Sequence, residues 1–186
     1  MTNRCVIKVG GSLFDRKDFP MRMFTLLKTE YADQQVNLVF GGGGIIDALR
    51  DIDSAHAMNP HEMHWRCIRA LGLTFDLACE WFPQTTRIET SKAFESHRNC
   101  RLTGHYLIAI DSFYSRSDAD ALPQDWTTTS DSISALLATK LGINRLALVK
   151  SCSEHQLTVE AAADAGIVDP VFPEASRNLA VTWHFL

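Results

Sequence analysis

Short apolar runs alternate with amphipathic stretches along the chain. The runs are rich in β-branched residues and end at glycine, lysine or other polar residues, as buried strands do. They predict strands over 5–9, 36–40, 86–89, 102–110, 146–149 and 179–183. Apolar residues at helical spacing predict helices over 19–27, 45–52, 60–82, 133–141 and 159–165, with a short helix between the third and fourth strands. Polar residues and prolines predict loops over 115–124 and 169–173.

This regular alternation of strands and helices predicts an α/β fold, because a mainly parallel sheet needs helices to connect its strands and cover its faces. The chain has 186 residues, which is most simply one domain and is long enough to bury a core without disulfides. Residues 1–186 are therefore expected to form a single domain.

Composition excludes several classes of protein. The net charge of −4 lacks the basic excess of a nucleic-acid-binding surface, so no nucleic-acid partner is expected. The five cysteines are scattered without a CxxC pair, which predicts reduced thiols and no zinc site. His61, Glu62 and His64 also lack the HExxH spacing of a zinc site. Lys8 interrupts the first apolar run, and no run approaches the roughly 18 residues that span a bilayer, so we expect a cytoplasmic protein without a membrane partner.

Two glycine-rich loops are the first candidates for chemistry. Gly10-Gly11-Ser12 and the four glycines at 41–44 each follow a predicted strand and precede a helix-like pattern. In a parallel sheet both loops would lie at the same edge, where glycine amides and helix N-termini bind anions. Tight turns that need positive φ are the structural alternative, although four consecutive glycines are hard to explain as a turn alone.

Lys8 lies within the first apolar run, two residues before the glycines. An unpaired charge buried in a strand is costly, so its position asks for a reason. Near the end of the strand, the stem can follow the sheet and place the ammonium beside the glycine loops. There it would be held against a phosphoryl group in transfer. A lysine exposed at the sheet edge is the alternative.

Three segments together resemble the amino acid kinase family, which includes aspartate, acetylglutamate, carbamate, uridylate and isopentenyl phosphate kinases. They are KVGGS at 8–12, FGGGG at 40–44 and WTTTSDSISALLA at 126–138. The resemblance implies a three-layer αβα sandwich with a mainly parallel central sheet, in which about 1–110 binds the acceptor and about 111–186 binds the nucleotide. It also implies ATP and Mg²⁺ as cofactors, with a homo-oligomer left open.

The resemblance assigns roles to the matching residues. Lys8 contacts the transferring phosphoryl group, and Asp131 holds that lysine in position; a carboxylate stabilised by the helix N-terminus is the alternative for Asp131. The residues whose amides face the phosphoryl group are Gly10, Gly11 and Ser12. The residues between the phosphoryl group and the acceptor are Gly42, Gly43 and Gly44. Thr129 and Ser130 either cap the helix or contact the nucleotide, and capping is the simpler expectation.

A narrower resemblance concerns the acceptor. HWRCIRAL at 64–71 and LPQDWTTTSDSISALLA at 122–138 are similar to small kinases of methanofuran-type cofactor biosynthesis. Those enzymes phosphorylate an aminomethylfuran methyl phosphate and make a diphosphate. His64 and Asp47 would then contact the acceptor; a partly buried histidine and a surface carboxylate are the alternatives.

The chain also departs from the family pattern after the fifth strand. Many relatives carry Thr-Asp-x-x-Gly there and a later Gly-Gly-Met segment with a second catalytic lysine, whereas this chain has Lys150-Ser151-Cys152-Ser153 and no Gly-Gly-Met. Lys150 is either the second catalytic cation on the nucleotide phosphates or an ordinary strand-terminal lysine. Remaining nucleotide contacts are expected within 154–175. The leading prediction is an ATP-dependent kinase with a small phosphorylated acceptor; an acylphosphate-forming kinase and a non-catalytic nucleotide-binding protein are the alternatives.

Overall fold

A wholly parallel sheet forms the centre of the molecule. The computed structural model describes residues 3–152 and 158–186. Within this part of the chain six strands are hydrogen-bonded in the order β3-β4-β2-β1-β5-β6, and all neighbouring pairs are parallel. Their bounds are β1 (Asn3–Val9), β2 (Gln34–Phe40), β3 (Thr86–Ile88), β4 (Gly104–Ile108), β5 (Arg145–Lys150) and β6 (Ala180–Phe185). The predicted strands and their parallel arrangement are confirmed.

Helices connect the strands and cover the sheet. They are α1 (Phe19–Glu30), α2 (Gly44–His56), α3 (Pro60–Trp81), α4 (Ser91–Arg98), α5 (Ser130–Leu141), α6 (Val159–Asp164) and α7 (Phe172–Ala175). Three 3-10 turns are η1 (Gly11–Leu13), η2 (Ile110–Ser112) and η3 (Arg116–Asp118). The predicted start of α3 and end of α5 hold: the side chain of Asn59 accepts from the Glu62 amide, and Gly142 ends α5 in the left-handed conformation. The helix α5 begins at Ser130, three residues before the predicted stretch 133–141.

The structure differs from the predictions in short segments. The strand expected over 102–110 is limited to β4, because the chain turns into η2 at Ile110. The expected loop over 115–124 contains η3, which Ser115 and Asp118 close as a capping box. The expected loop over 169–173 runs into α7, where Pro173 is tolerated in the first turn.

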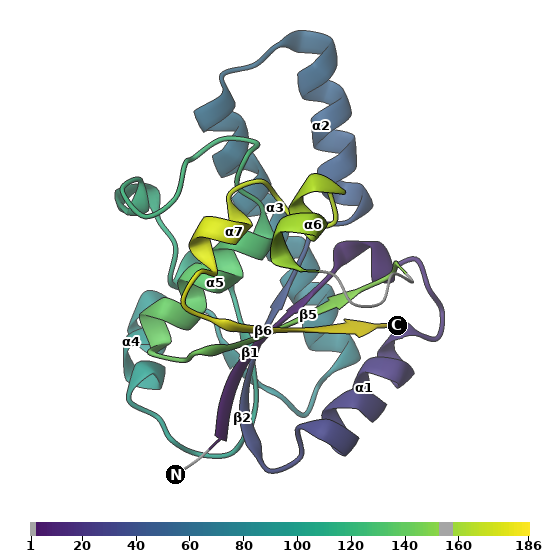
Figure 1. Cartoon of the computed structure of the whole chain (residues 1–186), viewed down its shortest axis with the longest axis vertical. Helices are drawn as coiled ribbons and strands as arrows, with labels where there is room; N and C mark the ends of the chain where they lie inside the picture. The colour runs from purple at the N-terminus through teal and green to yellow at the C-terminus, as the bar shows by residue number, and fades with distance from the viewer. Residues whose placement is uncertain (1–2, 153–157) are drawn as a thin grey trace.

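Side-chain alternation along the strands divides the core into two layers. Ile7 and Val9 of β1 pack in the layer that contains α1, whereas Val6 packs in the layer that contains α5, α6 and α7. Figure 1 shows α5, α6 and α7 grouped together, apart from α1, with α2 at the far end of the molecule. Helices on both faces of one parallel sheet give the expected three-layer αβα sandwich.

The sheet order also locates the place where a ligand is expected. From β1 the chain continues to β2 on one side, and it later returns to β5 on the other side of β1. Ligands of open parallel sheets bind at such a reversal, beyond the carboxyl ends of the strands. Lys8 and Lys150 lie at the carboxyl ends of the two strands that flank this point.

Two composition-based expectations can be compared with the described residues. The five cysteines are free thiols, and three of them are buried. Within 3–152 and 158–186 no helix combines the length and apolar character needed to cross a membrane.

Candidate active site

Two lysines and one aspartate form a buried ionic cluster at the carboxyl ends of β1 and β5. Lys8 Nζ lies 2.8 Å from Asp131 Oδ1, and Lys150 Nζ lies 2.9 Å from each carboxylate oxygen of Asp131. Lys150 also donates to the carbonyl oxygen of Ile167 at 2.7 Å. The three charged residues are 4 to 8% exposed. The structure therefore brings together Lys8, Asp131 and Lys150, which the sequence had placed in one candidate site.

The fold explains why these side chains meet. Lys8 follows Val6 by two residues and Lys150 follows Leu148 by two, so both lysines face the layer that contains α5. The parallel register aligns Lys8 with Leu148, which places Lys150 one pleat further along the adjacent strand. Asp131 is the second residue of α5, and this helix begins above the ends of both strands.

The cluster contains two cationic groups for one carboxylate. Burial and, after it, the positive charge of Lys8 lower the pKa of Lys150 to about 8, and the Asp131 carboxylate acts in the opposite direction. Burial alone would raise the pKa of Asp131, but the ammonium groups of Lys8 and Lys150 outweigh it and hold that pKa below its usual range. An excess positive charge in a buried site is unfavourable until an anion arrives. The cluster is therefore suited to binding an anionic group.

The two glycine loops lie against each other beside this cluster. A side chain on Gly11 would come within 2.0 Å of Gly43 N, and one on Gly43 would come within 2.5 Å of Gly11 O. Gly43 also has a φ of +53°, a conformation that side chains disfavour. Among the hydrogen bonds of the described residues, none uses the amides of Gly11, Gly42 or Gly43 as donor. These amides can therefore donate to an anion.

Gly10 and Gly44 lie differently from the other glycines of the two loops. The amide of Gly10 donates to the carbonyl oxygen of Val149 at 2.8 Å and so extends the β1–β5 pairing. That amide cannot at the same time face a phosphoryl group. Gly44 is the first residue of α2, and it is not on the wall of the neighbouring pocket.

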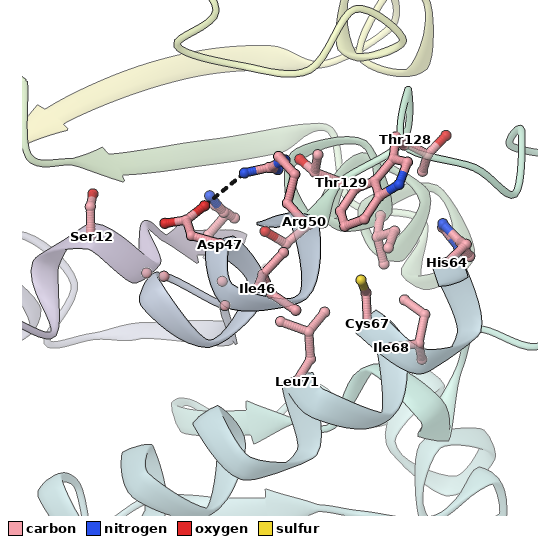
Figure 2. A pocket seen from close by; sticks show the side chains of 18 of the residues that line it. Ser12, Ile46, Asp47, Arg50, His64, Cys67, Ile68, Leu71, Thr128 and Thr129 are labelled. Carbon is pink, nitrogen blue, oxygen red and sulfur yellow. Dashed lines mark hydrogen bonds and ion pairs between the residues drawn. The ribbon is translucent and has the colours of Figure 1, made fainter. Parts of the chain in front are cut away.

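A pocket of about 240 Å³ lies between the glycine loops, α2, α3 and the loop before α5. Figure 2 shows side chains from these elements converging on it. The predicted site residues on its wall are Lys8, Gly11, Ser12, Gly42, Gly43, Asp47, His64, Thr129 and Ser130. The other wall residues are Gly41, Ile46, Arg50, Cys67, Ile68, Leu71, Asp125, Trp126, Thr128 and Ile133. Asp131 and Lys150 are not on the wall, but both lie next to Lys8 or its partner.

His64 lies on the pocket wall with both ring nitrogens in use. Nδ1 lies 3.1 Å from the carbonyl oxygen of Asp125, and Nε2 lies 3.0 Å from the hydroxyl of Tyr114. Burial lowers the pKa of His64, which favours the neutral ring. A neutral ring satisfies both contacts by donating from Nδ1 to the carbonyl and accepting at Nε2 from the hydroxyl. His64 is thus a satisfied, buried histidine that can contact a ligand only through its ring surface.

Arg50 and Trp126 are pocket residues that the sequence did not single out. The guanidinium carbon of Arg50 lies 5.1 Å from the centre of the Trp126 ring, and Nη1 of Arg50 lies 2.7 Å from Asp47 Oδ1. Trp126 Nε1 donates to Asp53 Oδ2 at 2.6 Å. Asp47, Arg50 and Asp53 are three residues apart along α2, a spacing that places them on one face of the helix.

Asp169 was also missed as a site residue. Its Oδ2 accepts from the amide and hydroxyl of Thr129, at 3.0 and 2.7 Å, and from the amide of Ser132 at 3.1 Å. Its Oδ1 accepts from the Ser132 hydroxyl. Thr129 is the N-cap of α5, as the simpler expectation had it. Asp169 therefore fixes the turn that carries Asp131.

The segment predicted to hold further nucleotide contacts, 154–175, is described from residue 158 onward, and 154–157 lie outside the described residues. Two connections tie its described part to the ionic cluster, through Ile167 O and Asp169. No group of three or more His, Cys, Asp or Glu side chains is placed to hold a metal ion in residues 3–152 and 158–186.

The parallel sheet, its strand order and the flanking helices define an amino acid kinase fold. The UMP kinase from Ureaplasma parvum has a TM-score of 0.71 at 12% sequence identity, over 100% of this chain and 91% of that chain. The UMP kinase from Bacillus anthracis has a TM-score of 0.68 at 11% identity, over 98% and 87%. The uridylate kinase from Archaeoglobus fulgidus has a TM-score of 0.63 at 15% identity, over 98% and 90%. The sequence itself matches no family model and no curated protein.

Proposed function

We propose that this chain is an ATP-dependent kinase that transfers the γ-phosphoryl group to a small phosphorylated acceptor and forms a diphosphate. The observation that carries the proposal is the buried Lys8–Asp131–Lys150 cluster, which holds one positive charge in excess where the order of the parallel strands reverses. The likeness to structures of UMP kinases supports both the reaction and a phosphorylated acceptor.

Phosphoryl transfer asks the protein mainly for positioning and charge neutralisation. Lys8 and the amides of Gly11 and Gly43 would hydrogen-bond to the transferring group as negative charge shifts across it. Lys150 would contact the nucleotide phosphates, and its pKa of about 8 leaves it protonated at neutral pH. Asp131 would aim both ammonium groups. Mg²⁺ enters with the nucleotide as part of the substrate and neutralises charge on its phosphates.

The acceptor would occupy the pocket next to Lys8. Its volume of about 240 Å³ is below the roughly 300 Å³ at which pockets for drug-sized ligands begin, which favours a small acceptor. An aminomethylfuran methyl phosphate is the acceptor implied by the resemblance at 64–71 and 122–138. UMP is the second acceptor to test, because it is named for the structural relatives.

Product analysis tests the proposal. The protein is incubated with Mg-ATP and, separately, with the aminomethylfuran methyl phosphate, UMP, aspartate or acetylglutamate, and products are followed by phosphorus NMR. We expect a diphosphate from one of the two phosphorylated compounds, formed at least about a hundredfold more slowly by Lys8→Ala. A product trapped by hydroxylamine would identify an acylphosphate and overturn the diphosphate assignment. ATP binding in calorimetry without transfer to any acceptor would favour a non-catalytic nucleotide-binding protein.

A further inference from the structure

The chain contains two arginine–tryptophan pairs of the same kind, and their hydrogen bonding differs. In the first pair, the guanidinium carbon of Arg116 lies 5.4 Å from the centre of the Trp65 ring. Its Nη1 is bonded to His61 Nε2 at 2.8 Å and to Glu62 Oε1 at 2.9 Å, and its Nη2 is bonded to Glu62 Oε2 at 3.0 Å. Arg116 thus uses both terminal nitrogens within the protein, and it is not on the pocket wall.

Arg50 forms the second pair, and one edge of its guanidinium is open. Nη1 donates to Asp47 at 2.7 Å, whereas Nε and Nη2 have no hydrogen-bond partner among the residues that the structure describes. The Trp126 ring lies 5.1 Å below the guanidinium carbon and is itself held by Asp53. The Asp47 contact and the tryptophan together fix the plane of the guanidinium. Two parallel N–H groups on one edge match the spacing of two phosphate oxygens.

The open edge belongs to the acceptor pocket. Arg50 and Trp126 line it together with Lys8, and Figure 2 shows Arg50 between Asp47 and Thr129. Lys8 and Arg50 are the cationic side chains on the wall among the described residues, and the proposed function assigns Lys8 to the transferring phosphoryl group. A second negative charge in the pocket would therefore meet Arg50.

The rest of the wall is mixed, with apolar side chains on the α3 side and the carboxylates of Asp47 and Asp125 among its polar groups. Ile46 of α2 and Ile68 and Leu71 of α3 supply apolar surface, and Figure 2 shows them on the side of the pocket nearest α3. The Thr128 hydroxyl is also buried on this wall and has no hydrogen-bond partner within the described residues. The pocket thus combines the cations of Lys8 and Arg50, several polar groups and an apolar floor.

We propose that Arg50 binds the phosphate that the acceptor already carries, through Nε and Nη2, while Trp126 holds the guanidinium in place. This inference rests on the proposed kinase function and narrows it: the acceptor is a small phosphomonoester. Its own phosphate is recognised by Arg50, and the new phosphoryl group is recognised by Lys8. The corresponding alcohol lacks the group that Arg50 binds and is a poor acceptor.

Kinetics of Arg50→Ala, Arg50→Lys and the matched control Arg116→Ala test the proposal. With whichever phosphorylated acceptor is turned over, Arg50→Ala raises the KM for the acceptor by about ten- to a hundredfold, as expected for loss of a charge-assisted bidentate contact. The KM for Mg-ATP stays near the wild-type value. Arg50→Lys recovers only part of the loss, because an ammonium cannot donate from a planar edge. Arg116→Ala, which breaks a similar exposed pair outside the pocket, leaves both KM values unchanged. Equal acceptor KM values in Arg50→Ala and wild type would overturn the proposal.

Binding measurements separate this inference from the proposed function. Calorimetry compares UMP with uridine, and the aminomethylfuran methyl phosphate with its alcohol, on wild-type protein and Arg50→Ala. We expect wild type to bind one phosphorylated compound at least about tenfold more tightly than its alcohol, and Arg50→Ala to lose that preference. If this result holds while no phosphoryl transfer is detected, the subsite stands and the kinase proposal fails. If neither phosphorylated compound is preferred by wild type, the subsite proposal is wrong whatever the protein catalyses.

Discussion

Lys150→Met is the substitution that most clearly separates stability from activity in the ionic cluster. Methionine has a similar length and carries no charge into the buried site. In the wild-type protein, burial and the neighbouring Lys8 lower the pKa of Lys150 from 10.5 to about 8. One pKa unit corresponds to about 1.4 kcal/mol, so keeping Lys150 protonated costs the folded state about 3 kcal/mol relative to a lysine with an ordinary pKa.

The sign of the resulting pH dependence follows from proton binding. The unfolded chain keeps the Lys150 proton up to about pH 10.5, whereas the folded protein releases it at about pH 8. Between these values the unfolded state binds more protons, so the free energy of unfolding rises with pH. Lys150→Met lacks this contribution. The unfolding free energy of wild type minus that of Lys150→Met should therefore increase by about 3 kcal/mol from pH 8 to pH 10.5.

Urea unfolding followed by tryptophan fluorescence at several pH values measures this difference. The same preparations are assayed for phosphoryl transfer, where Lys150→Met should lose about a hundredfold or more because a cation near the nucleotide phosphates is gone. Lys140→Met is the matched control: Lys140 pairs with Asp118 at 2.6 Å outside the site, so activity should persist. A difference in unfolding free energy that stays flat across this pH range, or near-normal turnover of Lys150→Met, would refute the reasoning.

Three further predictions address the remaining parts of the site. Lys8→Ala and Asp131→Ala should each reduce turnover by about a hundredfold or more, as expected when transition-state charge stabilisation is removed; near-normal turnover in either variant would exclude that residue from the transfer. Gly43→Ala should destabilise the fold by about 1–3 kcal/mol in thermal or urea unfolding and impair turnover, because its φ is +53° and its side chain would lie 2.5 Å from Gly11 O. Gly44→Ala, with no atom within 4 Å of the new side chain, is its control, and equal behaviour of the two variants would contradict the loop geometry. Asp169→Asn should lower both melting temperature and turnover, since an amide nitrogen replaces an oxygen that accepts from Thr129 or Ser132, at about 1–3 kcal/mol for a buried donor left unpaired; wild-type values for both would show that Asp169 does not hold the turn.

Most of the fold could be predicted from the sequence because its long elements carry a clear period. The buried strands and the helices α1, α3 and α5 repeat apolar residues over many positions. The 3-10 turns and α7 are three or four residues long, which is too short for a helical period to be visible.

The candidate site was predictable where residues are close in the sequence or match a known motif. The Lys8–Asp131 pair was expected from the resemblance, but the sharing of Asp131 by Lys150 depends on the register between β1 and β5. Arg50 and Trp126 are brought together by tertiary packing of α2 against a distant loop. Asp169 likewise reaches α5 across about forty residues of chain, a contact that no local pattern announces.

The central claim is that Lys8 binds the transferring phosphoryl group and Lys150 binds the phosphates of the same nucleotide. A crystal structure with Mg²⁺ and a non-hydrolysable ATP analogue tests it most directly. We predict γ-phosphate oxygens within hydrogen-bonding distance of Lys8 Nζ and the Gly11 amide, and a phosphate oxygen of the same nucleotide within that distance of Lys150 Nζ. A γ-phosphate bound away from both lysines would contradict the account.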